Sequence, residues 1–188
     1  MIYNNPNING SNWPELNILE TLRKKNPLVI CITNDVVRTF TANGLLAIGA
    51  SPVMSECSED LKDLIVHASA LLINIGTVTP DKVTYYKEAV KLAKAHEVPI
   101  ILDPVGCHAG AYRLSVVLDL IKTGAISLLR GNQSEIKAIY DALNTNHKID
   151  SSLSGKGVDG EQVEDSAIIT YRLARQINCP VVATGEED

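Results

Sequence analysis

The sequence predicts an α/β fold: a mostly parallel sheet with helices on both faces. Six short apolar runs alternate along the 188 residues with longer amphipathic stretches, the pattern of a repeated strand–helix unit. The runs are continuously apolar, as expected for strands that are covered on both faces. We expect strands at Val29–Thr33, Pro52–Met54, Leu71–Ile75, Ile100–Leu102, Ile126–Leu129 and Val181–Ala183.

Helices are expected in the stretches between these runs. The first, over Glu15–Lys25, precedes the first strand, and its last three residues are basic, which stabilises the carboxyl end of a helix dipole. A second clear helix is expected over Asp81–His96, because its apolar side chains fall largely on one face. Pro80 stands at its start, a position that proline favours, and Val98-Pro99 ends it.

Two segments depart from this regular pattern. Asn144–Gln162 holds three Gly, three Ser and two Lys, and a loop of this length is often functional or disordered. Its Gly155-Lys156-Gly157 lacks the remainder of a P-loop. The chain ends on the strand Val181–Ala183 and three acids, without a helix to cover that strand. We therefore expect one α/β domain over residues 1–188, with its C-terminal part absent.

Composition narrows the possible partners. Lys plus Arg number 17 against 22 Asp plus Glu, so the net charge is −5, and a basic nucleic-acid surface is not expected. The polar first thirteen residues and the absence of an apolar stretch near about 20 residues predict a cytoplasmic protein without a membrane partner. The four cysteines lack metal-ligand spacing, so we expect Cys31 and Cys179 to be buried small side chains.

Polar residues or glycines follow each apolar run, and ligands of open α/β sheets bind at the carboxyl ends of the strands. Asp103 ends a strongly apolar run, and Glu135 begins a helix shortly after Arg130. Two separated carboxylates suit Mg²⁺, and an arginine suits phosphate. The spacing from Asn132 to Glu135 also fits a capping box at a helix start. From the residues alone, both interpretations of Glu135 stay open.

A cysteine hydrolase is an alternative, because Cys107 and His108 follow the Asp103 strand. Adjacent side chains rarely meet productively, however, and no third orienting group is identified. The other histidines, His67, His96 and His147, are expected at the surface.

Five sequence blocks, in this order and spacing, resemble the hydroxyethylthiazole kinase family from about residue 15 to the end. The blocks are CITNDVVRTFTANGLLAIGASPVM (Cys31 to Met54), LLINIGT (Leu71 to Thr77), ILDPVG (Ile101 to Gly106), LLRGNQSEI (Leu128 to Ile136) and VVATGEED (Val181 to Asp188). The resemblance implies a ribokinase-like fold and an ATP- and Mg²⁺-dependent kinase. It further implies a homotrimer with active sites between subunits, and phosphorylation of the alcohol of 5-(2-hydroxyethyl)-4-methylthiazole in thiamine biosynthesis or salvage.

The same resemblance assigns roles to individual residues. It implies a thiazole pocket, an ATP site and a magnesium site, and it leaves the catalytic residue unknown. The implied positions are Asn34, Pro52, Met54, Gly76 and Thr77 for the thiazole, Arg130, Asn132 and Thr184 for ATP, and Asp103 and Glu135 for Mg²⁺. Met54 fits such a pocket, because a thioether adapts well to an aromatic ring.

Some positions depart from the family pattern. Cys107, His108, Ala109 and Gly110 stand where the family has a small residue followed by Gly-Ala-Thr, Thr39 replaces an expected Asn, and Glu187 replaces an apolar residue. The family's Gly-rich turn with its cysteine, which forms the anion hole, falls beyond Asp188. These departures keep two rivals open: a ribokinase-like kinase for another small alcohol, and a non-catalytic ligand-binding paralogue.

Overall fold

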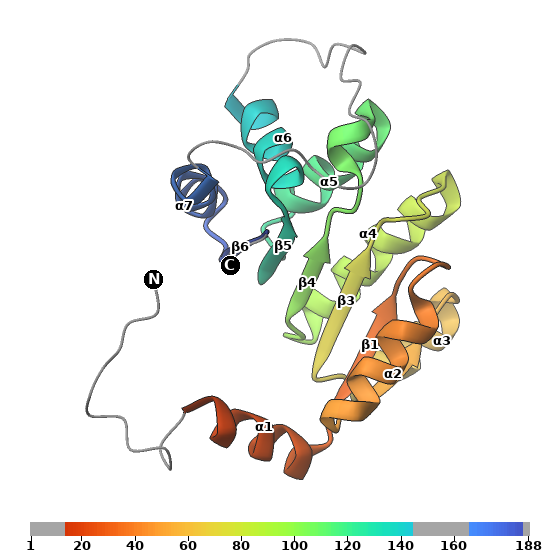
Figure 1. Ribbon diagram of the computed structural model, residues 1–188. Helices are drawn as coiled ribbons and strands as arrows, with labels where there is room; N and C mark the ends of the chain where they lie inside the picture. Colours follow the sequence, from red (N-terminus) through yellow and green to blue (C-terminus); the bar gives the residue numbers. More distant parts are fainter. Residues whose placement is uncertain (1–13, 145–165, 186–188) are drawn as a thin grey trace, which may run out of the picture.

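The computed structural model describes residues 14–144 and 166–185, which form a six-stranded parallel sheet with helices on both sides (Figure 1). The predicted fold class is confirmed. The strands are β1 (Leu28–Ile32), β2 (Ser51–Met54), β3 (Ala70–Asn74), β4 (Ile100–Asp103), β5 (Leu128–Asn132) and β6 (Val181–Thr184). The helices are α1 (Pro14–Lys25), α2 (Arg38–Ile48), α3 (Ser58–Ile65), α4 (Pro80–Ala95), α5 (Ala111–Lys122), α6 (Gln133–Asn144) and α7 (Ser166–Ile177), with a short 3-10 helix η1 (Cys107–Ala109).

The strand order is β2-β1-β3-β4-β5-β6, and every neighbouring pair is parallel. The chain moves from β1 outward to β2 and then returns past β1 to β3. The direction of winding therefore reverses between β1 and β3, which is where open α/β sheets leave a crevice for ligands. The register brings Asn74 opposite Asp103 and Asn132 opposite Thr184, so the polar strand ends share one edge.

Strand boundaries differ from the apolar runs because backbone pairing sets them. Ile126 is buried but lies before β5, contrary to the expected strand Ile126–Leu129. At its other end, β5 continues through the polar Asn132, because that residue is still in register with Thr184 of β6. Thr33 and Ile75 lie just beyond their strands.

The two faces of the sheet are covered unequally. Figure 1 shows α2 on the near side of β1 and α4 on the far side, and α3 to α7 pack one against the next. In the described part of the chain, side chains along β3, β4 and β5 largely alternate between buried and less buried, so one face of these strands is buried more completely than the other. The fully buried set includes Leu71, Ile73, Ile100, Leu102 and Leu129.

Local signals explain the helix ends. Thr79 caps α4, with its Oγ1 accepting the backbone N–H of Lys82 at 3.2 Å, and Pro80 occupies the first turn as predicted. Gly49 ends α2 at φ +100°, a conformation that favours glycine, and a Cβ there would approach Cγ of Arg23 to 2.6 Å. The basic end of α1 is confirmed.

None of the described helices is long and apolar enough to cross a membrane. Most of the expected irregular segment Asn144–Gln162, including His147, lies outside the described residues.

Candidate functional site

A pocket of about 330 Å³ lies at the carboxyl ends of β1 and β2 and the start of α4, beside the β1–β3 reversal. We call it the switch-point pocket; its lining includes Cys31, Thr33, Met54, Ser55, Lys82 and Tyr85. Thr33 is buried, and its Oγ1 has no hydrogen-bond partner among the described residues. The hydroxyls of Ser55 and Tyr85 lie 2.7 Å apart, and burial raises the pKa of Tyr85. The pocket thus combines a thioether with several hydroxyl groups.

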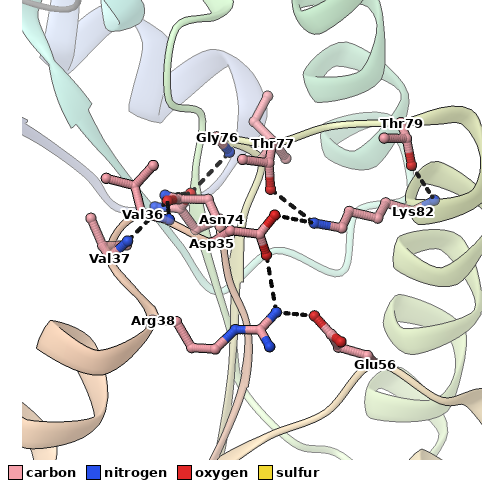
Figure 2. Close-up of polar contacts among 12 residues, drawn as sticks. Asp35, Val36, Val37, Arg38, Glu56, Asn74, Gly76, Thr77, Thr79 and Lys82 are labelled. Atoms are coloured by element: carbon pink, nitrogen blue, oxygen red, sulfur yellow. Dashed lines mark hydrogen bonds and ion pairs between the residues drawn. The ribbon is translucent and has the colours of Figure 1, made fainter.

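Charged side chains border this pocket and join three loops (Figure 2). Arg38 contacts both Asp35, at 3.1 Å, and Glu56. Lys82 reaches Asp35 at 3.8 Å, and its Nζ donates to Oγ1 of Thr77 at 2.8 Å. These half-exposed ion pairs contribute little stability, so their main effect is to set the charge at the pocket mouth.

A chain of buried amides runs from β1 across β3 to β4. Nδ2 of Asn34 donates to Oδ1 of Asn74 at 2.8 Å, and Nδ2 of Asn74 donates to Oδ2 of Asp103 at 2.7 Å. Oδ1 of Asn34 accepts the N–H groups of Val36 and Val37, so this side chain also shapes the approach to α2.

Gly76 allows the side chains of Asn34 and Asn74 to pack closely against the backbone. Its N–H donates to Oδ1 of Asn74 at 2.9 Å, and a Cβ at Gly76 would approach Nδ2 of Asn34 to 2.6 Å. Any larger residue at position 76 would therefore displace the Asn34 amide.

Asp103 carries a strongly perturbed carboxyl group. Its pKa is raised from 3.8 to about 6: burial is the largest cause and the nearby Glu135 adds to it, whereas Arg130 and the hydrogen bond from Asn74 act in the opposite direction. Nη1 of Arg130 lies 3.8 Å from Oδ2 of Asp103, and the Asp103 side chain is only 16% exposed. Buried carboxyl groups that face another acid are typical of functional sites, because a bound cation relieves both penalties.

The Asp103 pKa predicts how stability depends on pH. Between about pH 4 and 6 the folded protein holds a proton that the unfolded chain releases, so the free energy of unfolding falls as the pH rises. Asp103→Asn removes this titration. In magnesium-free buffer we expect the variant to match the wild type near pH 4 and to be more stable by roughly 2 kcal/mol at pH 7.5. Thermal unfolding at several pH values measures this, and parallel curves for the two proteins would contradict it.

The structure bears out the capping-box interpretation of Glu135. Asn132 and Glu135 form the predicted capping box: the N–H of Asn132 donates to Oε2 at 2.8 Å, and the N–H of Glu135 donates to Oδ1 of Asn132 at 2.9 Å. The other carboxylate oxygen, Oε1, accepts the N–H of Gly106 at 2.8 Å. A Cβ at Gly131 would approach Oε2 to 3.0 Å, so this glycine gives Glu135 its space. Both carboxylate oxygens are thus occupied by backbone donors.

The structure places the ten predicted site residues in two groups. Around the switch-point pocket, Met54 lines the cavity, Pro52 lies two residues earlier on the same strand face, and Thr77 binds the pocket residue Lys82. Asn34 and Gly76 belong to the amide chain behind it.

The second group, which we call the β4–β5 edge, comprises Asp103, Arg130, Asn132, Glu135 and Thr184. Oγ1 of Thr184 donates to the carbonyl oxygen of Gly131 at 3.4 Å. The amide Asn74 joins the two groups. The sequence does not predict this linking role, because it identifies Asn74 only as a strand-end residue. The position of Asn74 one strand away from Asp103 in the predicted sheet could have indicated it.

Cys107 lacks the properties of a nucleophile. Its thiol is fully buried, burial raises its pKa strongly, and Sγ donates to the carbonyl oxygen of Glu135 at 3.6 Å. Reactive cysteines need a lowered thiol pKa, so the structure speaks against the hydrolase alternative.

Cys31 and Cys179 are buried, and His67 and His96 are exposed, as predicted. Among the described residues no cluster of three or more His, Cys, Asp or Glu could hold a metal.

Comparisons with known proteins agree on one family. Residues 19–188 match the sequence profile of the hydroxyethylthiazole kinase family. Over 170 residues the chain is 52% identical to "Hydroxyethylthiazole kinase" of Streptococcus agalactiae serotype Ia and 50% identical to that of Streptococcus suis. These matches cover 90% of this chain but 63% and 62% of the relatives, so the chain spans less than two thirds of their length. A solved hydroxyethylthiazole kinase structure from Pyrococcus horikoshii OT3 superposes with a TM-score of 0.76 at 36% identity, covering 90% of this chain and 59% of the other.

Proposed function

The chain belongs to the hydroxyethylthiazole kinase family, and from this premise we propose that the protein uses ATP to phosphorylate the alcohol of hydroxyethylthiazole. The observation that carries the proposal is the buried amide chain from Asn34 through Asn74 to Asp103, which links the switch-point pocket to the β4–β5 edge. A kinase must hold an alcohol and a phosphoryl donor in fixed relation, and a rigid hydrogen-bonded link between two sites does this. The reaction belongs to thiamine biosynthesis or salvage.

The switch-point pocket supports binding of the thiazole. Met54 offers a soft surface to an aromatic ring, and the buried Thr33 hydroxyl, which has no partner among the described residues, is available to a polar ligand atom. The other residues proposed to bind the thiazole are Asn34, Pro52, Gly76 and Thr77. In a pocket of this kind apolar walls bind the ring and a few polar atoms orient it.

The β4–β5 edge supports binding of ATP with magnesium. The raised pKa of Asp103, due first to burial and then to Glu135, is the shift expected of a carboxylate whose charge a bound cation would balance. Asp103 would hold Mg²⁺, whereas Glu135, whose oxygens bind the N–H groups of Gly106 and Asn132, would act at longer range through its charge. When bound, the ion neutralises phosphate charge. Arg130, Asn132 and Thr184 would bind the nucleotide.

The protein's own part in the reaction is positioning and charge stabilisation. Nδ2 of Asn74 binds Asp103, and Oδ1 of Asn74 binds the N–H of Gly76. The Asp103 carboxyl group and the loop at Gly76 are therefore held in a fixed position relative to each other. Arg130 presents a permanent positive charge to phosphate oxygens. Phosphoryl transfer to an oriented alcohol needs little covalent chemistry from the protein, which is why positioning groups carry most of the effect.

The test is detection of product by mass spectrometry. Full-length protein is incubated with ATP, magnesium and an equimolar mixture of hydroxyethylthiazole, hydroxymethylpyrimidine and pyridoxal. Thiazole phosphate as the main product is the expected result. Phosphorylation of another alcohol would favour a divergent kinase, and saturable binding without product would favour a ligand-binding paralogue; either result overturns the proposal.

Met54→Ala should weaken binding of the thiazole while leaving ATP binding nearly unchanged. The variant removes the thioether from the pocket wall, and we expect a Kd for hydroxyethylthiazole about tenfold higher, as for the loss of a buried contact worth about 1.4 kcal/mol. Separate calorimetric titrations measure the two ligands. Val66→Ala, which shortens an exposed apolar side chain elsewhere, is the control. An unchanged thiazole Kd would show that the ring binds away from Met54.

We also propose a homotrimer with active sites between subunits, in the cytoplasm, where ATP is supplied. Helix α2 buries none of its residues within the described chain, and the apolar side chains Val36, Phe40 and Leu46 are 86%, 81% and 58% exposed. Exposed apolar side chains that gather on one surface mark interfaces, and Val36 and Phe40 each lie two positions from the pocket residue Arg38 in the sequence. Sedimentation equilibrium of the full-length protein measures the mass, and a monomer at micromolar concentration would contradict the trimer.

A further inference from the structure

Arg113 occupies an unfavourable position for a positive side chain. It lies in the first turn of α5, and the amino end of a helix already carries a partial positive charge. A cation there needs compensation from elsewhere in the fold, and its partners identify what it does.

The Arg113 guanidinium binds three backbone carbonyl groups. Nη1 donates to the carbonyl oxygens of Val105 at 3.0 Å and Ile75 at 3.2 Å, and Nη2 donates to that of Gly76 at 2.8 Å. Ile75 and Gly76 follow β3, whereas Val105 follows β4. One planar group therefore joins two loops that are 29 or more residues apart in sequence.

Each of these loops carries one half of the proposed active site. The N–H of Gly76 binds Asn74, the central amide of the chain that begins beside the switch-point pocket. The N–H of Gly106, next to Val105, binds Oε1 of Glu135 at the β4–β5 edge. A shift of either loop would therefore move one half of the site relative to the other.

We propose that Arg113 is a positioning residue that fixes the thiazole-side loop relative to the nucleotide-side loop. The inference rests on the proposed kinase function and deepens it. The fixed fork of a guanidinium serves several acceptors at set angles, which the single ammonium of lysine does not reproduce. Loss of the fork should impair the alignment of two bound substrates more than the binding of either one.

The first experiment compares Arg113→Lys with wild type in the full-length protein. We expect kcat to fall at least about tenfold, while the Kd of hydroxyethylthiazole and the Kd of ATP, each titrated alone, change less than about threefold. Arg172→Lys, at an exposed position of α7, is the matched control and should keep the wild-type kcat. An unchanged kcat in Arg113→Lys, or a loss of binding with no loss of kcat, would overturn the proposal.

Chemical rescue separates positioning from folding. In Arg113→Ala, added guanidinium ion at non-denaturing concentration should restore part of kcat, and an alkylammonium ion at equal ionic strength should not. Equal restoration by the two ions, or by neither, would speak against a role for the guanidinium fork.

A third readout needs no activity. In Arg113→Lys we expect the amide hydrogens of Gly76 and Gly106 to exchange at least about tenfold faster, because the loops that hold them are no longer joined. Unchanged exchange would refute the joining role even if the protein is a kinase. Faster exchange in a protein whose wild type yields no thiazole phosphate would instead refute the proposed function and leave the joining role intact.

Discussion

Replacing Asp103 by asparagine is expected to lower the kcat of the full-length protein by about 100-fold or more, while the Kd for hydroxyethylthiazole changes by less than about twofold. The asparagine keeps an oxygen that can accept the hydrogen bond from Asn74, so the amide chain survives. What it removes is the negative charge at the end of β4, the group proposed to hold magnesium. Because that charge lies on the proposed nucleotide side, binding at the proposed thiazole pocket should be unaffected.

Initial rates of product formation and separate calorimetric titrations measure the two quantities. The dependence of rate on magnesium gives a further check, because the variant should need more of the ion for half-maximal activity. Asp119→Asn is the control: it removes an exposed carboxylate that pairs with Lys87 at the surface of α5. Equal turnover in Asp103→Asn and wild type would rule out the proposed magnesium role of Asp103.

Glu135→Gln is expected to lower the free energy of unfolding by about 2 kcal/mol, a large change for a substitution that preserves shape. The carboxylate accepts one N–H on each oxygen, from Gly106 and from Asn132. A glutamine amide has one oxygen and one NH₂ group, so one of the two backbone donors must face another donor. Glu135 is only 3% exposed, and water cannot easily replace the lost partner.

Urea unfolding at pH 7 measures this difference. Lys137→Gln on the same helix is the control, since its pair with Asp141 is half-exposed and spans one helical turn, and it should change stability by less than about 0.5 kcal/mol. If Glu135→Gln were as stable as wild type, the two backbone hydrogen bonds would not be the main role of this side chain.

Much of the fold follows from the sequence because hydrophobic burial and parallel pairing leave a clear periodic pattern. The Val181–Ala183 run lies within β6, and Pro80 begins α4, both as predicted. The errors come from tertiary pairing: Ile126 is apolar and buried without being in the ladder, and β5 reaches Asn132 through its register with β6.

The sequence predicts which residues make up the candidate site but not the hydrogen bonds that connect them. Asp103 was predicted as a site residue because an isolated acid ends a strongly apolar run, and in the structure burial and the nearby Glu135 raise its pKa. Arg113 could not be predicted from the sequence, because its partners are backbone carbonyls, which have no sequence signature. Glu135 had two equal interpretations, and only the positions of Gly106 and Asn132 show that its oxygens are occupied.

The strand order also has a consequence for how the protein assembles as it is synthesised. From β4 onward each strand pairs with the strand made just before it, so every addition extends one growing edge of the sheet. The β1, β2 and β3 strands can pair before β5 and β6 leave the ribosome. The wall of the switch-point pocket is thus built early in translation, and the surface proposed for the nucleotide is added to it later.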